Sequence, residues 1–221
     1  MGEKLNLGVL VSGRGSNLQS IIDAVEEGRL EASLKIVLSD REDAFGLERA
    51  RKQGIDAEWV DPSPHAGRED YDRAVVAKLR EADVELVVLA GFMRILSPLF
   101  VESFRNRIMN IHPALLPSFP GLHVQQKAID HGARFSGCTV HLVDTGVDTG
   151  PIIIQAAVPV LDGDSEESLS RRILKQEHRI FPKAIQLYAE GRIRVKGRRV
   201  FIDGGEEENG GECLVNPPLA R

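Results

Sequence analysis

The chain of 221 residues is long enough to bury a substantial core, as one large domain or two small ones. Its net charge of −5 and its aromatic content of 5% argue against a general nucleic-acid binder, which needs a basic surface or a base-stacking platform. No apolar run approaches the length of a membrane span, and the first residues show no signal-peptide pattern. We therefore expect a cytoplasmic protein whose partners are neither nucleic acid nor membrane.

The two cysteines, Cys138 and Cys213, lie far apart and have no C-x-x-C spacing. Cys138 stands in an apolar run, which predicts a buried core residue rather than half of a disulfide. The sequence shows no cluster with the spacing of metal ligands, so no metal is expected.

The first half of the chain alternates strands and helices. Apolar runs predict strands, and periodic apolar positions predict helices, one face of the first helix being formed by Leu18, Ile21, Ile22 and Val25. The predicted strands are 5–12, 35–38, 56–60, 84–90 and 107–111, and the predicted helices are 18–25, 45–53 and 68–81. This alternation predicts a Rossmann-like α/β fold, an open, mostly parallel twisted sheet with helices on both faces.

Beyond residue 121 the pattern changes. A short helix is predicted at 123–131, a hairpin-like pair of strands at 136–143 and 152–160, a long helix from 164 towards 190 and a terminal hairpin at 192–195 and 199–202. Pro182 lies inside the long helix as a potential kink. We expect a single domain over 1–203, with halves 1–105 and 106–203, followed by a flexible acidic tail at 204–221.

Ligands of such sheets bind beyond the carboxyl ends of the strands, so the loops after Val11, Leu38, Leu89 and Ile111 should gather at one edge. Three of these loops carry residues of chemical interest, and a glycine-bearing loop after residue 143 lies near the same edge. The sequence therefore predicts one ligand site built from several loops.

The first of these loops is Ser12-Gly13-Arg14-Gly15-Ser16-Asn17. Its glycines let the backbone approach a ligand, and a helix N-terminus presents unpaired N–H groups, so we favour a phosphate site. The alternative is a tight turn in which Ser16 or Asn17 only caps the helix. Leu18 replaces the third glycine of the dinucleotide fingerprint, which weakens the interpretation as a dinucleotide-binding site. Asp40 stands where a ribose-binding acid would fall, so this interpretation is kept as an alternative.

Asn110 and His112 are two residues apart on a strand and should point to the same face. An amide donor beside an imidazole can stabilise a developing oxyanion and move a proton. Asp148 would favour the charged imidazolium if it lay close to His112. The alternatives are turn-forming polar groups at a strand end and an ordinary loop aspartate.

The loop Gly91-Phe92-Met93-Arg94-Ile95-Leu96 follows the most hydrophobic strand. Apolar side chains at a ligand edge would suit a flat aromatic ligand, and Arg94 an attached carboxylate. The alternative is core packing beside a solvated arginine.

Four motifs in this order together resemble the phosphoribosylglycinamide formyltransferases, the folate-dependent enzymes of purine synthesis. They are Ser12-Gly13-x-Gly15-Ser16-Asn17, Ala90-Gly91-Phe92-Met93-Arg94-Ile95-Leu96, Asn110-Ile111-His112-Pro113-x-Leu115-Leu116-Pro117 and Asp148-x-Gly150-Pro151. The Asn-x-His-Pro segment is shared by the wider formyltransferase superfamily, whereas the Gly-Ser-Asn loop narrows the resemblance to the glycinamide enzymes. Ala114 departs from the many members that carry serine there.

The resemblance implies a formyltransferase fold, 10-formyltetrahydrofolate as co-substrate, no metal, small-molecule partners and a monomer or homodimer. It implies that 1–105 is the phosphate-binding half and 106–203 the catalytic and folate-binding half. It assigns phosphate binding to Gly15, Ser16 and Asn17, ribose binding to Glu177, folate binding to Arg68, Met93, Arg94, Ile95, Leu96 and Asn110, and catalysis to Asn110, His112 and Asp148.

Other functions compete with this one. A formyltetrahydrofolate deformylase uses a similar core with water as acceptor, but its usual regulatory domain is not expected before a first strand at residue 5. A methionyl-tRNA formyltransferase is expected to need a further tRNA-binding domain. A noncatalytic nucleotide-binding module or a NAD-linked dehydrogenase is disfavoured by Leu18.

Overall fold

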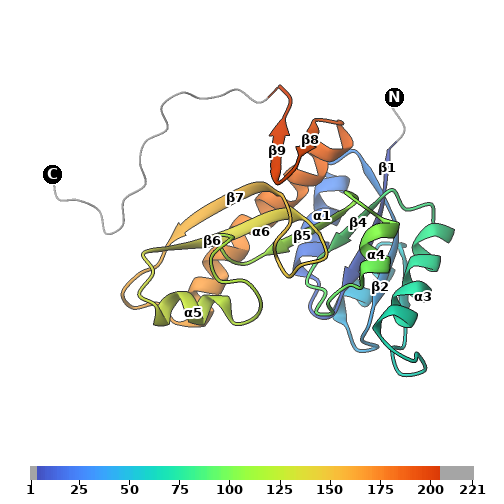
Figure 1. Ribbon diagram of the computed structural model, residues 1–221, viewed down its shortest axis with the longest axis horizontal. Coiled ribbons are helices and arrows are strands. Elements are labelled where there is room, and N and C mark those ends of the chain that lie inside the picture. The colour runs from blue at the N-terminus through green and yellow to red at the C-terminus, as the bar shows by residue number, and fades with distance from the viewer. Residues whose placement is uncertain (1–3, 205–221) are drawn as a thin grey trace.

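The computed structural model describes residues 4–204, which form a seven-stranded sheet and a separate two-stranded sheet (Figure 1). The strand order of the large sheet is β3-β2-β1-β4-β5-β6-β7. Its strands are β1 (Leu5–Val11), β2 (Ala32–Ser39), β3 (Asp56–Trp59), β4 (Leu86–Leu89), β5 (Ile108–His112), β6 (Phe135–Leu142) and β7 (Ile152–Pro159). The first five pair in parallel, and β6 and β7 are added antiparallel at the β5 edge, which confirms the predicted open, mostly parallel sheet.

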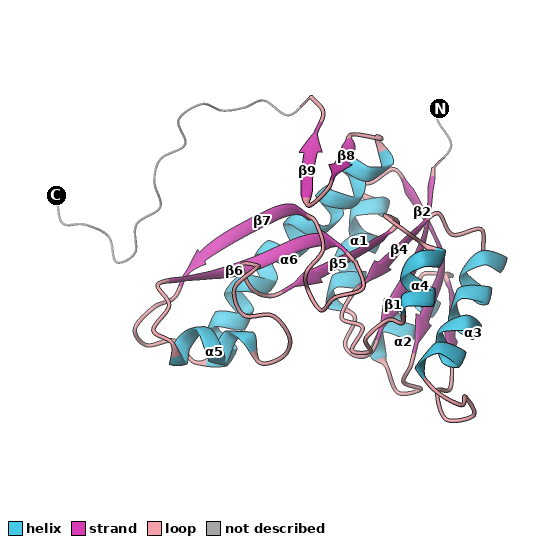
Figure 2. Ribbon diagram, in the orientation of Figure 1, coloured by secondary structure: helices cyan, strands magenta, loops and turns pink. Residues whose placement is uncertain are grey.

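Helices pack on both faces of the sheet (Figure 2). One face is covered by α1 (Ser16–Glu26), α2 (Phe45–Lys52), α5 (Val124–Asp130) and α6 (Glu166–Ala189), and the other by α3 (Arg68–Glu81) and α4 (Pro98–Ser103). The central strands supply side chains to both cores because neighbouring strand residues point to opposite faces. In β4, for example, Val88 belongs to the first core and Val87 to the second.

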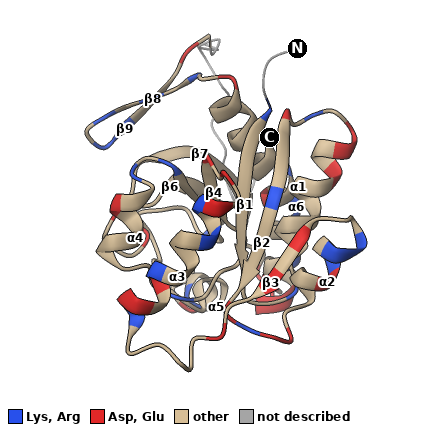
Figure 3. Ribbon diagram, turned by 90° about the vertical axis from the view of Figure 1, so that its right-hand side faces the viewer, with Lys and Arg blue, Asp and Glu red and all other residues tan. Residues whose placement is uncertain are grey.

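Burial on both faces explains why the central strands are almost wholly apolar. β1 has no charged residue, whereas α2 and α3 carry charges of both signs on their outer faces (Figure 3). Cys138 of β6 is fully buried as predicted, and burial raises the pKa of its thiol to about 12.

Helix α4 was not predicted from the sequence. The helix has six residues, too few to show an apolar period, but its start is encoded locally. Ser97 accepts a hydrogen bond from the Phe100 amide, and Pro98 occupies the first helical position, where its missing N–H costs nothing. The other predicted elements are present with shifted ends, β4 being shorter than the predicted 84–90.

The second half follows the prediction closely. Ser165 caps α6 in a reciprocal pair with Ser168, and the helix continues through Pro182 to Ala189. The terminal hairpin consists of β8 (Ile193–Lys196) and β9 (Arg199–Ile202). Most of the predicted acidic tail, residues 205–221, lies outside the described residues. Between residues 4 and 204, no helix is both long and apolar enough to cross a membrane.

The pairing of β6 with β7 depends on a glycine. A Cβ at Gly137 would lie 2.0 Å from the Ala156 carbonyl oxygen and 2.9 Å from a Leu115 methyl group. Because the first obstacle is backbone, Gly137→Ala should lower the free energy of unfolding by about 1–3 kcal/mol or more in urea denaturation. The control is Gly163→Ala, since no atom of residues 4–204 other than those of Gly163 and its two chain neighbours lies within 4 Å of that Cβ. Equal stability of the two variants would contradict this account.

Candidate active site

A cavity of about 350 Å³ opens beyond the carboxyl ends of β4 and β5. It is lined by the loop after β4, the end of β5, residues 121–125 and the segment from His141 to Asp148. Seven of the residues predicted from the sequence line it: Met93, Arg94, Ile95, Leu96, Asn110, His112 and Asp148. The structure thus brings the predicted catalytic set and most of the predicted folate set to one place.

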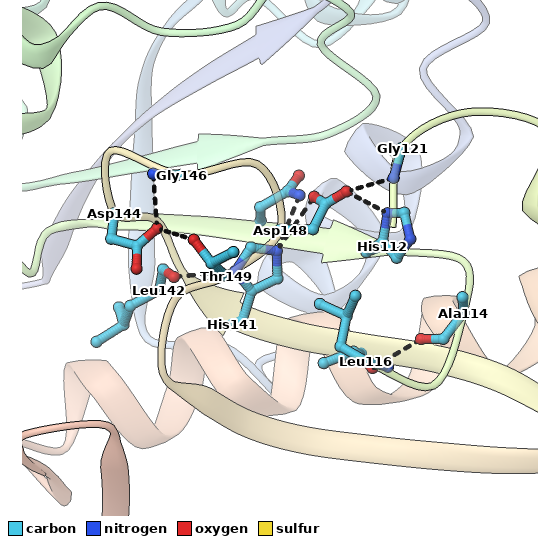
Figure 4. A network of polar contacts seen from close by, with 12 residues as sticks. His112, Ala114, Leu116, Gly121, His141, Leu142, Asp144, Gly146, Asp148 and Thr149 are labelled. Carbon is cyan, nitrogen blue, oxygen red and sulfur yellow. Dashed lines mark hydrogen bonds and ion pairs between the residues drawn. The ribbon is translucent and has the colours of Figure 1, made fainter. Parts of the chain in front are cut away.

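His112 is buried between two acceptors, of which Figure 4 shows Asp148. Its Nε2 lies 2.9 Å from the Phe119 carbonyl oxygen, and its Nδ1 lies 3.4 Å from a carboxylate oxygen of Asp148. A carbonyl oxygen only accepts, so Nε2 carries a hydrogen, and a carboxylate favours a hydrogen on Nδ1 as well. Both ring nitrogens of His112 therefore face hydrogen-bond acceptors.

Asp148 is the point at which separate segments meet. Its carboxylate accepts a hydrogen bond of 2.9 Å from the Gly121 amide, faces Nδ1 of His112 and lies 3.8 Å from Nε2 of His141. The backbone at Asp148 has a φ of 54°, in the left-handed region that aspartate tolerates better than most residues. Its side chain is only 12% exposed, so its charge is held largely by these neighbours rather than by water.

His141 is a site residue to which the sequence analysis gave no role. Its Nδ1 lies 2.9 Å from the Leu142 carbonyl oxygen, so Nδ1 carries the hydrogen. Burial lowers the pKa of His141, which favours the neutral ring with a bare Nε2. That nitrogen lies 3.2 Å from the side-chain amide nitrogen of Asn110 and accepts one of its hydrogens.

The antiparallel register explains how His141 reaches the site. Asn110 of β5 stands opposite His141 of β6, and His112 stands opposite Thr139. The Thr139 hydroxyl donates to the Ala114 carbonyl oxygen at 2.7 Å and accepts from the Leu116 amide at 3.1 Å, which fixes the loop after His112. The sequence predicted a strand at 136–143, but its pairing with β5 was needed to find these contacts.

Exposed apolar side chains surround the mouth of the cavity. Met93 and Leu122 are each 64% exposed, and Ile95 and Val147 are also exposed. Apolar surface around a few convergent polar groups is typical of a small-molecule site. Arg94 is not a freely solvated arginine: its guanidinium lies 4.5 Å above the Tyr71 ring, and its buried Nε has no hydrogen-bond partner among the described residues.

The predicted phosphate loop begins α1. The N-cap is Gly15, with a φ of 68°, and among the described residues no side chain caps this helix. The alternative that Ser16 or Asn17 serves as the cap is therefore wrong. Glycine is required at position 15 because a Cβ there would lie 2.7 Å from Cα of Gly46 in α2.

The two residues predicted to bind the phosphate-bearing substrate from distant parts of the chain are in contact. The Asn17 amide nitrogen donates to a carboxylate oxygen of Glu177 at 2.8 Å. Glu177 is 6% exposed, and its burial raises its pKa. Oδ1 of Asn17 is buried without a hydrogen-bond partner in the part of the chain that the structure describes. Gly15–Asn17 and Glu177 are not among the residues that line the cavity.

Two further sequence candidates lie outside the cavity lining. Arg68 is the exposed first residue of α3, and its folate role stays a prediction. Asp40 accepts a hydrogen bond from the Ser12 hydroxyl, and Leu18 is fully buried in α1.

Within residues 4–204, no group of three or more His, Cys, Asp or Glu side chains is arranged to hold a metal ion.

Comparison with known proteins identifies the class. The family model for formyl transferases matches residues 5–185. The chain therefore belongs to the formyl transferase family.

Two relatives narrow the comparison. The chain is 45% identical over 200 residues to the phosphoribosylglycinamide formyltransferase of Escherichia coli K12, covering 90% of this chain and 94% of that protein. It also resembles the crystal structure of glycinamide ribonucleotide transformylase 1 from Symbiobacterium toebii, with a TM-score of 0.90 and 53% identity over 91% of this chain and 95% of that chain.

A formyltetrahydrofolate deformylase from Pseudomonas syringae is a more distant relative. Its structure matches with a TM-score of 0.83 at 25% identity, over 91% of this chain and 66% of that chain. The deformylase is thus less similar in sequence to this chain than the two glycinamide enzymes are.

The lowered pKa of His141 makes a contribution to stability that depends on pH. Below the ordinary value of about 6.5 the unfolded chain binds a proton that the folded imidazole resists, so this contribution falls as the pH drops. We expect NMR titration of the ring to show a pKa below the ordinary value. In urea unfolding, His141→Gln should lose less stability than the wild type between neutral pH and mildly acidic pH. An equal loss in both proteins would contradict the buried neutral ring.

Proposed function

We propose that the chain transfers the formyl group of 10-formyltetrahydrofolate to the amine of 5-phosphoribosylglycinamide in purine synthesis. The products are 5-phosphoribosyl-N-formylglycinamide and tetrahydrofolate. The observation that carries this proposal is the convergence of Asn110, His112 and Asp148 on one cavity with an apolar rim, in a chain whose relatives include enzymes named for this reaction.

The first step is attack of the substrate amine on the formyl carbon. It produces a tetrahedral intermediate with negative charge on the former formyl oxygen. Asn110 and protonated His112 are the proposed donors to that oxygen, each worth roughly 3–4 kcal/mol by analogy with other oxyanion holes. The amide of Asn110 suits this role because one of its hydrogens is directed to His141, which fixes the nitrogen and leaves a second hydrogen for the substrate.

The second step moves a proton and breaks the bond between the formyl carbon and N10. The attacking nitrogen loses a proton, and the departing N10 gains one. His112 is the proposed carrier, with a water between the two nitrogens. Its Nε2–H is held by the Phe119 carbonyl, so transfer requires that bond to be exchanged for one to water or substrate. Asp148 keeps the ring charged and oriented.

The substrates have separate proposed binding groups. Gly15, Ser16 and Asn17 would hold the phosphate at the N-terminus of α1, and Glu177 the ribose hydroxyls. Met93 to Leu96, together with Arg68 and Asn110, would contact the folate. We retain 1–105 as the phosphate-binding half, 106–203 as the catalytic and folate-binding half, the cytoplasm as location and a monomer or homodimer as the assembly.

A single assay tests the reaction. The protein is incubated with 10-formyltetrahydrofolate, with and without phosphoribosylglycinamide, and tetrahydrofolate formation is followed. We expect the formation of tetrahydrofolate to depend on the presence of phosphoribosylglycinamide. Release at the same rate without the amine would replace the transferase by a hydrolase, and no release under either condition would overturn both folate functions.

The catalytic assignments predict large effects on turnover. His112→Ala and Asp148→Asn should each lower kcat by about 10²–10⁴-fold. The first variant removes the proposed proton carrier, and the second removes the carboxylate that orients its ring. Circular dichroism and thermal melting should show that both variants remain folded. Asp162→Asn is the matched control, since Asp162 has a 93% exposed side chain outside the cavity lining. A variant with near-normal kcat would remove its residue from the catalytic set.

A further inference from the structure

Ser12 stands at the carboxyl end of β1 and is 6% exposed. Its hydroxyl donates to a carboxylate oxygen of Asp40 at 2.6 Å and accepts the Met93 amide hydrogen at 2.8 Å. Its own backbone amide donates to the Gly91 carbonyl oxygen at 3.1 Å. One residue therefore connects the ends of β1, β2 and β4.

The direction of these bonds follows from their chemistry. A hydroxyl has one hydrogen and two lone pairs, whereas a carboxylate only accepts. The Ser12 hydrogen must therefore point to Asp40, which leaves the oxygen's lone pairs for the Met93 N–H. Hydrogen bonds to an ionised group are shorter and stronger than neutral ones, in agreement with the short contact to Asp40.

The connected segments are the two proposed substrate loops. Ser12 directly precedes residues 13–17, the proposed phosphate loop, and its partners Gly91 and Met93 lie in residues 91–96, the proposed folate loop. The phosphate loop is also held from its other side by α2. There the Gly46 amide donates to the Gly13 carbonyl oxygen at 2.9 Å, so a shift of the loop is resisted from both sides.

We propose that Ser12 is a positioning residue that holds the phosphate and folate loops in one register, with Asp40 fixing the direction of its hydroxyl. Asp40 thus acts on the serine rather than on the ribose of a dinucleotide. This inference rests on the proposed function, because the two loops matter together only if each binds one of two reacting substrates. Their spacing then sets the distance between the amine and the formyl carbon, on which the rate of such a reaction depends steeply.

The test compares Ser12→Ala with Ser12→Thr, which keeps the hydroxyl, and with Ser39→Ala as a matched control. Ser39 is a fully buried serine at the end of the adjacent strand β2, and its hydroxyl accepts the Arg41 amide instead of bridging the two loops. We expect Ser12→Ala to lower kcat and to raise KM for both substrates, so that kcat/KM falls by roughly tenfold or more, because the reacting atoms lose their alignment when a buried hydrogen bond to a charged group is removed. Ser12→Thr should recover most of this loss, and Ser39→Ala should change neither KM.

Amide hydrogen exchange supplies a readout that needs no catalysis. In Ser12→Ala, exchange should speed up in both 13–17 and 91–96, while the central strands keep wild-type protection. Faster exchange in one loop alone, or unchanged KM values with a lowered Tm, would overturn the inference. If the wild type transferred no formyl group, the proposed function would fail, and the exchange data would then still decide whether Ser12 joins the loops.

Discussion

The carboxylate of Asp148 is the contact on which the candidate site depends. It is largely shielded from water and is held by the Gly121 amide, with His112 and His141 facing its two oxygens. A charge removed from water must be compensated by hydrogen bonds or opposite charge, so the Gly121 amide and His112 stabilise the carboxylate, whereas the bare Nε2 of His141 offers it no hydrogen. Asp148 thereby joins the loop after β6 to the loop after β5 and to His112.

The two histidines beside this carboxylate have different surroundings and suit different tasks. His112 lies between two acceptors, the Phe119 carbonyl oxygen and the Asp148 carboxylate. His141 donates to the Leu142 carbonyl oxygen and is buried, and burial lowers its pKa and favours the neutral ring. A neutral His141 can accept a hydrogen from Asn110, whereas a charged one would repel that amide. The proposed division between His112 as proton carrier and His141 as orienting group is consistent with their different burial and partners.

The sheet topology explains why the site lies at this edge. Parallel pairing ends β1, β2 and β4 on the same side, so the proposed phosphate and folate loops become neighbours and Ser12 can bridge them. Antiparallel addition of β6 then places His141 and Thr139 opposite Asn110 and His112. The connection from β5 to β6 is not a tight hairpin, because residues 113–134, including α5, lie between the two strands.

Local patterns in the sequence were sufficient for the fold class, for the glycine loop before α1 and for the placement of Asn110 and His112 on one face, because strand and helix periods are encoded in contiguous residues. The tertiary structure alone decided the contacts across long separations. These include the pairing of Asn110 with His141, 31 residues apart, and of Asn17 with Glu177, 160 residues apart. Strand register and helix docking are set by packing between distant segments, and no local period in the chain specifies them.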